Sequence, residues 1–465
     1  MWVPLFKHLY LILLCGMPIV VVAQHQQAIL DERAKEDYSY LKDSTNLAWQ
    51  KAIKYLGFGA QNGSYISVGG SYRARYEHFT NRFWVNGNNQ NYYTQRISFH
   101  LDLHLGSVFR TFVELQSGYK TGEIAFLQND DIDFHQLFIE LKTGKAHQFS
   151  TRIGRQEMKL GAGRLVDIRV GPNVRRSFDL AQVAYQHKGL SVKAFYGEEV
   201  DIFFKRPFDN TNSLFSENAN SPTLWGVFSN LSLKEDKGSD CTELYYLGFR
   251  SGNSAFSDVE GEETRHSIGL RRAGFINKRF QFNSELIFQF GDLAGNTIRA
   301  FNFETDWKYT FPNTPWKPMP GIKLDWSSGD RNPADGKLNS FNPMFVNPAT
   351  YSLAAVNTPV NLLSFHPSLT LFPAPKFMIN LEYALFFRTS EDDGFYSPPR
   401  LQSRTAETIS SEHIGDVLGL FFKYTHSRYI QFDIRSSFFL PGDFIEDSGP
   451  SASIFQLATT LTLIL

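Results

Sequence analysis

The sequence predicts an all-β protein, a transmembrane antiparallel up-and-down β-barrel of about 18 strands. Three observations support this fold class. Segments of about ten residues, the length of a membrane-spanning strand, alternate between apolar and polar side chains along most of the chain. The chain also ends on such a segment, and aromatic residues make up 15% of its 465 residues. Membrane barrels need outward apolar faces for lipid and aromatic girdles at both interfaces, which accounts for all three features.

A secretory signal peptide is predicted at residues 1–23. A basic start precedes an apolar stretch, residues 9–22, which ends at the small residue Ala23. This pattern indicates cleavage after Ala23, and the stretch is short for a spanning helix. Cys15 raises the alternative of a lipoprotein, but Leu14 before it is larger than the small residue that lipid-attachment sites prefer.

Residues 24–60 differ from the rest of the chain because they are polar and rich in helix formers such as Ala34, Lys35 and Glu36. They are interpreted as a short periplasmic lead-in of helical or irregular structure. Residues 61–465 are assigned to the barrel domain, because the alternating segments begin there.

The strands are identified by a period of two. In residues 96–105 the odd-numbered positions are apolar and the even-numbered ones polar, and the pattern recurs at residues 280–290, 377–388, 429–440 and 455–465. A soluble sandwich also alternates, but its strands average about five or six residues. The charged faces also need water, which a lumen provides and a packed core does not. Roughly 400 residues at about 22 residues per strand and connection give about 18 strands, enough for an aqueous channel.

Three stretches rich in Gly, Pro and Asn are predicted to connect strands. They are residues 209–223, 312–320 and 327–358. Such loops usually lie on the extracellular side of a barrel, and some fold into the lumen and narrow it.

Composition argues against several other classes of protein. Lys and Arg number 46 against 47 Asp and Glu, so no global basic charge points to nucleic acid. After signal removal Cys241 is the single cysteine, which excludes an intramolecular disulfide and disfavours a cysteine metal site. No phosphate-binding loop or cofactor motif is present, so no cofactor and no metal are expected.

An enzyme is disfavoured although suitable residue types occur together. Ser98, His100, Asp102 and His104 share one strand face. Side chains on one strand face point in parallel and do not converge on a reacting atom. His100 and His104 also lack an identifiable third metal ligand.

Arginine on the polar faces indicates an anion passage. Arg73 and Arg75 share a face with Glu77, and six arginines crowd into residues 152–176. Guanidinium groups stay charged and bind carboxylates through two hydrogen bonds, so an arginine-lined constriction selects anions. The competing interpretation is that these are ordinary lumen charges in paired ladders. The residues predicted to line or support the passage are Arg73, Arg75, Arg96, Arg155, Arg164, Arg169, Arg175 and Arg176.

Several motifs resemble those of the alginate export family of outer-membrane barrels. The string GRQEMKLGAGRLVDIRVGPNVRRSFD at residues 154–179 is similar to a signature of that family, as is SSGDRNPADGKLNSFNP at residues 327–343. Residues 36–43 resemble its N-terminal segment, residues 71–77 its first strand, and residues 438–444 its closing hairpin. The matches keep the family's order across almost the whole mature chain.

The resemblance implies a monomeric 18-stranded barrel whose electropositive constriction passes an anionic uronate polymer, served by periplasmic export or gating partners. It places the arginines named above, apart from Arg96, at motif positions, with Glu77, Asp179, Asp330 and Asp335 as supporting acidic residues. Gly171 and Pro172 are expected to form a turn that presents Arg175 and Arg176. Asp330 either binds a cation or caps a turn, and the turn is the favoured role. The final residue is Leu465, whereas many barrels end in Phe. Leucine is also apolar, so it fits the alternation of the last strand.

The function predicted from the sequence is a passive outer-membrane channel for anionic poly- or oligosaccharides, in a Gram-negative-type bacterium. A general or nutrient-uptake porin of low selectivity is the alternative. An adhesin is a further alternative, but it needs larger or more repetitive outer loops. The expected partners are outer-membrane lipid, the anionic saccharide and periplasmic proteins.

Overall fold

The computed structural model describes residues 30–43, 48–59, 63–122, 129–144, 147–203, 206–217, 219–232, 240–350, 356–398, 401–406 and 409–465. The predicted signal peptide, its cleavage site after Ala23 and Cys15 lie outside these residues. Two compact units are separated at Asp37. In the first, a 3-10 turn, η2 (Arg33–Lys35), is closed by an ion pair of 3.1 Å between Arg33 Nε and Glu36 Oε1.

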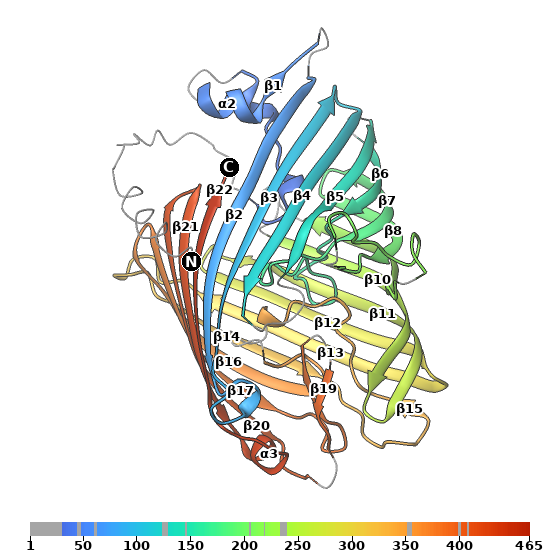
Figure 1. Ribbon diagram of the computed structural model, residues 1–465, viewed down its shortest axis with the longest axis vertical. Helices are drawn as coiled ribbons and strands as arrows, with labels where there is room; N and C mark the ends of the chain where they lie inside the picture. The colour runs from blue at the N-terminus through green and yellow to red at the C-terminus, as the bar shows by residue number, and fades with distance from the viewer. Residues whose placement is uncertain are drawn as a thin grey trace. The chain divides into compact units, whose positions relative to one another are not determined.

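The second unit is a closed antiparallel barrel (Figure 1). Its sheet has 20 strands among the described residues, and two of them, β1 (Leu56–Gly57) and β15 (Lys337–Leu338), have two residues each. The other 18 form the wall, each next to its neighbour in sequence, as predicted. They are β2 (Tyr65–Thr80), β3 (Gln90–Leu105), β4 (Phe109–Thr121), β5 (Asp130–Thr143), β6 (Gln148–Gln156), β7 (Phe178–His187), β8 (Leu190–Glu199), β9 (Thr223–Ser232), β10 (Asp240–Phe256), β11 (Val259–Ile276), β12 (Phe280–Leu293), β13 (Asn296–Tyr309), β14 (Met319–Ser327), β16 (Leu362–Ala374), β17 (Phe377–Phe387), β20 (His413–Ser427), β21 (Ile430–Pro441) and β22 (Ile454–Ile464).

The last strand closes the barrel against the first. β2 and β22 pair from Ser71 opposite Ile464 to Thr80 opposite Phe455, so the blue and red ends of the chain lie side by side (Figure 1). The alternation predicted for the C-terminal segment is therefore correct, and closure leaves no unpaired edge in the apolar part of the membrane.

The remaining elements of this unit are short. At the end of the wall that carries the C-terminus lie η3 (Ser39–Leu41) and α2 (Ala48–Lys54), and elsewhere lie η4 (Arg82–Trp84), η6 (Pro348–Thr350), α3 (Asp443–Asp447) and the hairpin of β18 (Phe395–Ser397) and β19 (Leu401–Arg404). In the described part of the chain, no helix is both long and apolar enough to cross a bilayer.

The outward face of the wall is apolar and the inward face is polar. On β3, Ile97, Phe99 and Leu101 are exposed on the outside, while His100 and Asp102 are buried within. The inward charges form ladders between neighbouring strands: Arg110 meets Asp102 at 2.7 Å and Arg152 meets Glu140 at 3.0 Å. A lumen that pairs its charges in this way avoids the penalty of isolated buried ions.

The two ends of the barrel have different connections. Next to the C-terminus the turns are short, for example residues 106–108 and 188–189, whereas the opposite end carries the long connections 157–177, 200–222, 328–361 and 388–412. Short turns face the periplasm in bacterial barrels.

One predicted loop is on the unexpected side. Residues 312–320 were expected with the extracellular loops, but residues 312–318 belong to the turn 310–318 between β13 and β14, at the end that carries the C-terminus, and Met319 and Pro320 begin β14. The physical reason is the parity of strand crossings: each wall strand reverses direction, so the position of a connection in the strand order decides its side.

Two long connections fold into the barrel. Residues 157–177, here called the inner loop, and residues 328–361, here called the long loop, meet in a parallel bridge between Val166 and Phe345. Apolar side chains of both loops pack against the wall from β7 to β13 in one buried cluster that includes Leu165, Phe249 and Phe345. This side of the lumen is therefore filled by protein.

Candidate functional site

The inner loop leaves the wall at β6 and is held by three arginines of β2 and β3, of which Arg75 donates from Nη1 to the carbonyl oxygen of Gly171 at 3.3 Å. Arg73 Nη1 donates to the carbonyl oxygens of Val170 at 2.7 Å and Gly171 at 2.8 Å. Arg96 Nη1 donates to the carbonyl oxygens of Val170 and Pro172, both at 3.3 Å. The predicted turn at Gly171 and Pro172 is thus the point where the loop is fastened to the wall.

Asn173 completes this attachment and was missed by the sequence analysis. Its Oδ1 accepts a hydrogen bond from Arg73 Nη2 at 2.9 Å, and its Nδ2 donates to the carbonyl oxygens of Gln95 at 2.9 Å and Tyr119 at 3.0 Å. The side chain is fully buried. Its position directly after the Gly-Pro pair was the available signal, because a short amide suits a turn that needs side-chain hydrogen bonds.

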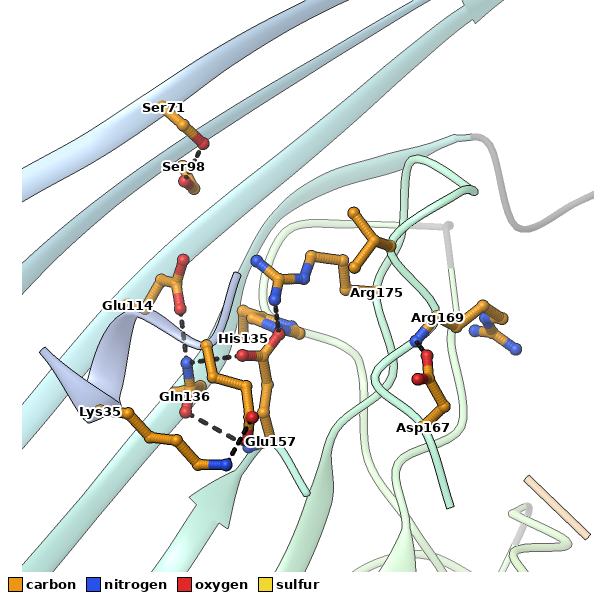
Figure 2. Close-up of polar contacts among 12 residues, drawn as sticks. Lys35, Ser71, Ser98, Glu114, His135, Gln136, Glu157, Asp167, Arg169 and Arg175 are labelled. Carbon is orange, nitrogen blue, oxygen red and sulfur yellow. Dashed lines mark hydrogen bonds and ion pairs between the residues drawn. The ribbon is translucent and has the colours of Figure 1, made fainter. Parts of the chain in front are cut away.

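The root of the inner loop is organised by Glu157, which the sequence analysis also missed (Figure 2). Its Oε1 lies 2.8 Å from His135 Nε2 and 2.6 Å from Arg175 Nη2. Gln136 donates from Nε2 to Glu114 at 2.7 Å and to Glu157 at 3.5 Å. Arg175 is therefore neutralised at the root of the loop.

Arg155 and Asp179 pair in the bidentate geometry predicted for a guanidinium and a carboxylate. Nε donates to Oδ1 at 2.9 Å and Nη2 to Oδ2 at 3.0 Å, across the neighbouring strands β6 and β7. Arg155 Nη1 also donates to the carbonyl oxygen of Asn210 at 3.0 Å, and Asn212 Nδ2 donates to Asp179 Oδ2 at 2.9 Å. The pair therefore fastens the connection 200–222 to the wall.

Two further arginines of the inner loop hold other parts of the chain together. Arg176 Nε donates to Glu199 Oε1 at 2.7 Å, and its Nη1 donates to the carbonyl oxygen of Phe345 on the long loop. Arg164 forms a buried ion pair with Glu304 of β13. Each guanidinium charge is compensated by a carboxylate, and both side chains hold the loops in place.

Arg169 is different. Its backbone N–H donates to Asp167 Oδ1 at 2.7 Å (Figure 2), and its φ of 54° lies in the left-handed region. Among the described residues its guanidinium forms neither an ion pair nor a hydrogen bond, and its Nε is buried without a partner. Burial, followed by the charge of Arg176, lowers the pKa of Arg169 to about 9, so the group stays charged at neutral pH. A strained backbone at a buried unpaired charge is typical of a functional position.

Positive charge accumulates where the inner loop meets β2 and β3. Arg96, Arg75 and Arg175 repel the guanidinium of Arg73, while Glu77 attracts it. Glu77 is itself engaged, since it pairs with Arg75 and accepts a hydrogen bond from Tyr92. The region therefore carries an excess of guanidinium groups over carboxylates.

A second basic position lies across β22 from this cluster. Arg435 of β21 is inward, near Arg75 and Glu77, because the intervening β22 residues Ala458 and Thr460 are small. Its side chain is 36% exposed, against 16% for that of Arg75. These are the more accessible guanidinium groups of this wall, and Arg435 was outside the predicted site.

The ring of Phe421 supports Arg435. The guanidinium lies 4.8 Å from the ring centroid, and its Nε is 3.5 Å from Asp433 Oδ1. An aromatic face beside a cation orients the cation while leaving hydrogen-bond donors free.

Two of the predicted acidic residues lie outside this arrangement. Asp330 of the long loop accepts hydrogen bonds at Oδ1 from the backbone N–H groups of Arg331 and Asn339, at 3.1 and 3.2 Å, as a turn cap does. Asp335 is exposed and pairs with Lys337 at 3.1 Å. Within the described residues, no group of three or more His, Cys, Asp or Glu side chains could hold a metal ion.

Comparison with solved structures shows the same fold in other bacterial proteins. Pseudomonas aeruginosa OccK11 (OpdR) gives a TM-score of 0.54 at 11% identity, covering 88% of this chain and 99% of that one. P. aeruginosa OccK2 (OpdF) in complex with glucuronate gives 0.55 at 13%, covering 86% and 98%. Acinetobacter baumannii OccAB1 gives 0.54 at 12%, covering 86% and 96%.

A search of curated proteins found no significant match. At 11–13% identity, the likeness to these structures shows the shared β-barrel fold. The family model described as "Alginate export" matches residues 64–458, almost the whole barrel. The chain, a β-barrel, therefore belongs to the alginate export family.

Proposed function

We propose that the protein is a passive outer-membrane channel for anionic poly- or oligosaccharides. The observation that carries the proposal is the excess of guanidinium groups around Arg73, where Arg75 and Arg96 lie nearby and Glu77 is the attracting carboxylate, while Arg175 is paired with Glu157. An excess of fixed positive charge in a narrow lumen raises the local concentration of anions and excludes cations.

The arginines divide into two roles in this proposal. Arg75, Arg169 and Arg435 act on the passing anion, because two are partly exposed and the third has no ion pair among the described residues; Arg75 also donates to the carbonyl oxygen of Gly171 at 3.3 Å. The others fasten the loops that narrow the lumen, through carbonyl groups or carboxylates. They are Arg73, Arg96, Arg155, Arg164, Arg175 and Arg176.

Weak attraction at several guanidinium groups suits the passage of an anionic polymer. Each accessible guanidinium attracts one carboxylate of the saccharide, and the Asp433 and Glu77 carboxylates beside them limit how long it stays. Conduction needs binding that is strong enough for entry and weak enough for release. The glucuronate complex of OccK2, a protein of the same fold, supports a uronate as the first substrate to test.

A porin of low selectivity is the second candidate. It is favoured by the pairing of Arg155, Arg164 and Arg176 with carboxylates, which removes most of the charge predicted from the sequence. In that case the family motifs serve the architecture of the loops, and periplasmic export partners are not needed.

The reversal potential of the refolded protein, measured in a planar bilayer under a salt gradient, distinguishes the anion-selective channel from the porin of low selectivity. We expect anion preference, reduced by Arg75→Gln, Arg169→Gln and Arg435→Gln together. Attraction at 4 Å is about 1 kcal/mol in water, roughly a fivefold change in local anion concentration for each charge. The matched control is Arg250→Gln, whose side chain is 62% exposed and pairs with Glu262 at the barrel rim.

Blockade by saccharides tests the substrate class in the same bilayer. Acidic uronate oligomers should interrupt the current, and neutral oligomers of equal length should not. Equal blockade by both, or an unselective wild-type current, would support the general porin.

A further inference from the structure

The segment before the first wall strand completes the barrel wall. β22 pairs with β2 only as far as Ser71, and the backbone of Leu465 exchanges hydrogen bonds with Gly70. Beyond that point β1 pairs with β2, Leu56 opposite Ile66 and Gly57 opposite Tyr65. The other edge of these β2 residues is occupied by β3, so β1 lies on the β22 edge and continues the line of β22.

Polar contacts hold α2 beside the barrel seam, the line along which β22 and β1 pair with β2. Lys54 Nζ donates to the carbonyl oxygen of Leu465 at 2.9 Å, and Gln50 donates to the hydroxyl of Tyr429 in the turn between β20 and β21. The ring of Trp49 lies 5.3 Å from that of Tyr429. The segment is thereby fixed to the ends of β21 and β22.

The buried and exposed sides of this segment are the reverse of those expected in water. Lys54 and Gln50 are buried, and Tyr55 stacks on Tyr65 on the inner side. Trp49 is 52% exposed and Leu56 is 43% exposed. A periplasmic segment surrounded by water would bury the apolar side chains first.

The exposed side continues the lipid-facing surface of the barrel. Directly opposed residues in a sheet point to the same face, so Leu56 shares the outward face of Ile66 and, one strand further, Leu103. Leu101 and Leu105 of the same face are also exposed. Trp49 is the residue type that membrane–water interfaces favour.

We propose that residues 48–58 form an interfacial anchor that seals the barrel seam and rests against phospholipid of the periplasmic leaflet. This proposal is independent of what the channel transports. It reassigns part of the predicted periplasmic lead-in to the membrane surface, with Trp49, Leu56 and Phe58 as the contacting side chains.

Site-directed spin labelling tests the anchor in the full mature chain. In a Cys241→Ser background, single labels replace Trp49 or Leu56 in vesicles of phosphatidylethanolamine and phosphatidylglycerol. The lipid reference is a label at Phe288, exposed on the outer face of β12, and the water reference is a label at Asp392, exposed in the connection 388–412.

Both test labels should be more accessible to oxygen and less accessible to a water-soluble nickel complex than the label at Asp392, approaching the values at Phe288. Test labels that match Asp392 would overturn the proposal and leave this surface open to water or to a protein partner. If Leu56→Cys fails to refold, Phe58→Cys replaces it. Heat-modifiable migration and unchanged conductance verify the barrel in every variant.

Discussion

Arg73 and Asn173 lie 100 residues apart in sequence, and their side chains meet with 2.9 Å between Nη2 and Oδ1. The contact joins the first wall strand to the tip of the inner loop, so it helps to set how far the loop extends across the lumen. Asn173→Ala removes three hydrogen bonds and leaves buried partners unsatisfied, at about 1 kcal/mol or more for each.

We expect the Asn173→Ala channel to remain folded and to show larger, noisier single-channel currents, because the loop tip is released. Single-channel recording measures this, with Asn88→Ala in the β2–β3 connection as the control. Currents identical to wild type would mean that the carbonyl contacts of Arg73 and Arg96 hold the loop alone.

The Arg155–Asp179 pair should show strong coupling in a double-mutant cycle. Arg155→Gln alone leaves the Asp179 carboxylate without its ion-pair partner, and Asp179→Asn alone leaves Arg155 only the longer contact of 3.6 Å to Asp133. We expect each single variant to lower the free energy of unfolding by about 3 kcal/mol and the double variant by much less than the sum. Urea unfolding in lipid vesicles measures the cycle, and additive effects would contradict a direct pair.

Arg169 is predicted to contribute to anion preference while lowering the stability of the barrel. Arg169→Met removes a buried charge that has no ion pair among the described residues, so the barrel should gain about 1 kcal/mol or more in stability. The same variant should lose anion preference. Thermal unfolding and reversal potentials measured on one preparation test both effects, and a loss of stability would show that the guanidinium is satisfied by water or ions.

The Asp330 carboxyl should make stability depend on pH. Burial and the nearby Asp393 raise the pKa of Asp330 above its ordinary value. The folded state therefore binds more protons than the unfolded state just above the ordinary pKa of about 4, so stability falls as pH rises from there through the raised value.

Asp330→Asn should remove part of this fall. The Oδ1 acceptor of the turn is retained, and the amide group replaces an Oδ2 that is buried without a partner. Unfolding midpoints between pH 4 and pH 8 measure the slope, with the exposed Asp335→Asn as the control. An unchanged slope in Asp330→Asn would assign the pH dependence to other groups.

Mass spectrometry of the protein from outer membranes should give a mature chain that begins at Gln24. The apolar stretch before Ala23 predicts this cleavage, because signal peptidase prefers small residues at the end of such a stretch. A lipid-modified fragment beginning at Cys15 would instead establish the lipoprotein alternative.

The strands were predictable because their signal is local. Alternation in segments such as β3 and β22 requires only that one face meets lipid and the other meets water, so neighbouring residues in sequence carry the whole pattern. For the same reason the inward position of Arg73, Arg75 and Glu77 followed from their shared parity. The family motif likewise indicated that residues 154–179 are unusual before any contact was known.

Which charge meets which partner depended on the closed barrel. Sequence placed Arg155, Arg169, Arg175 and Arg176 together, but only the fold pairs Arg155 with Asp179 and Arg175 with Glu157 and leaves Arg169 without an ion pair in the described part of the chain. Arg435 came near Arg75 because closure put β21, β22 and β2 side by side with small residues between. The sequence by itself determined the strands, the faces and the basic loop, since these follow from local periodicity. The tertiary structure decided which guanidinium groups remain accessible, because ion pairing depends on register and loop path between residues far apart in sequence.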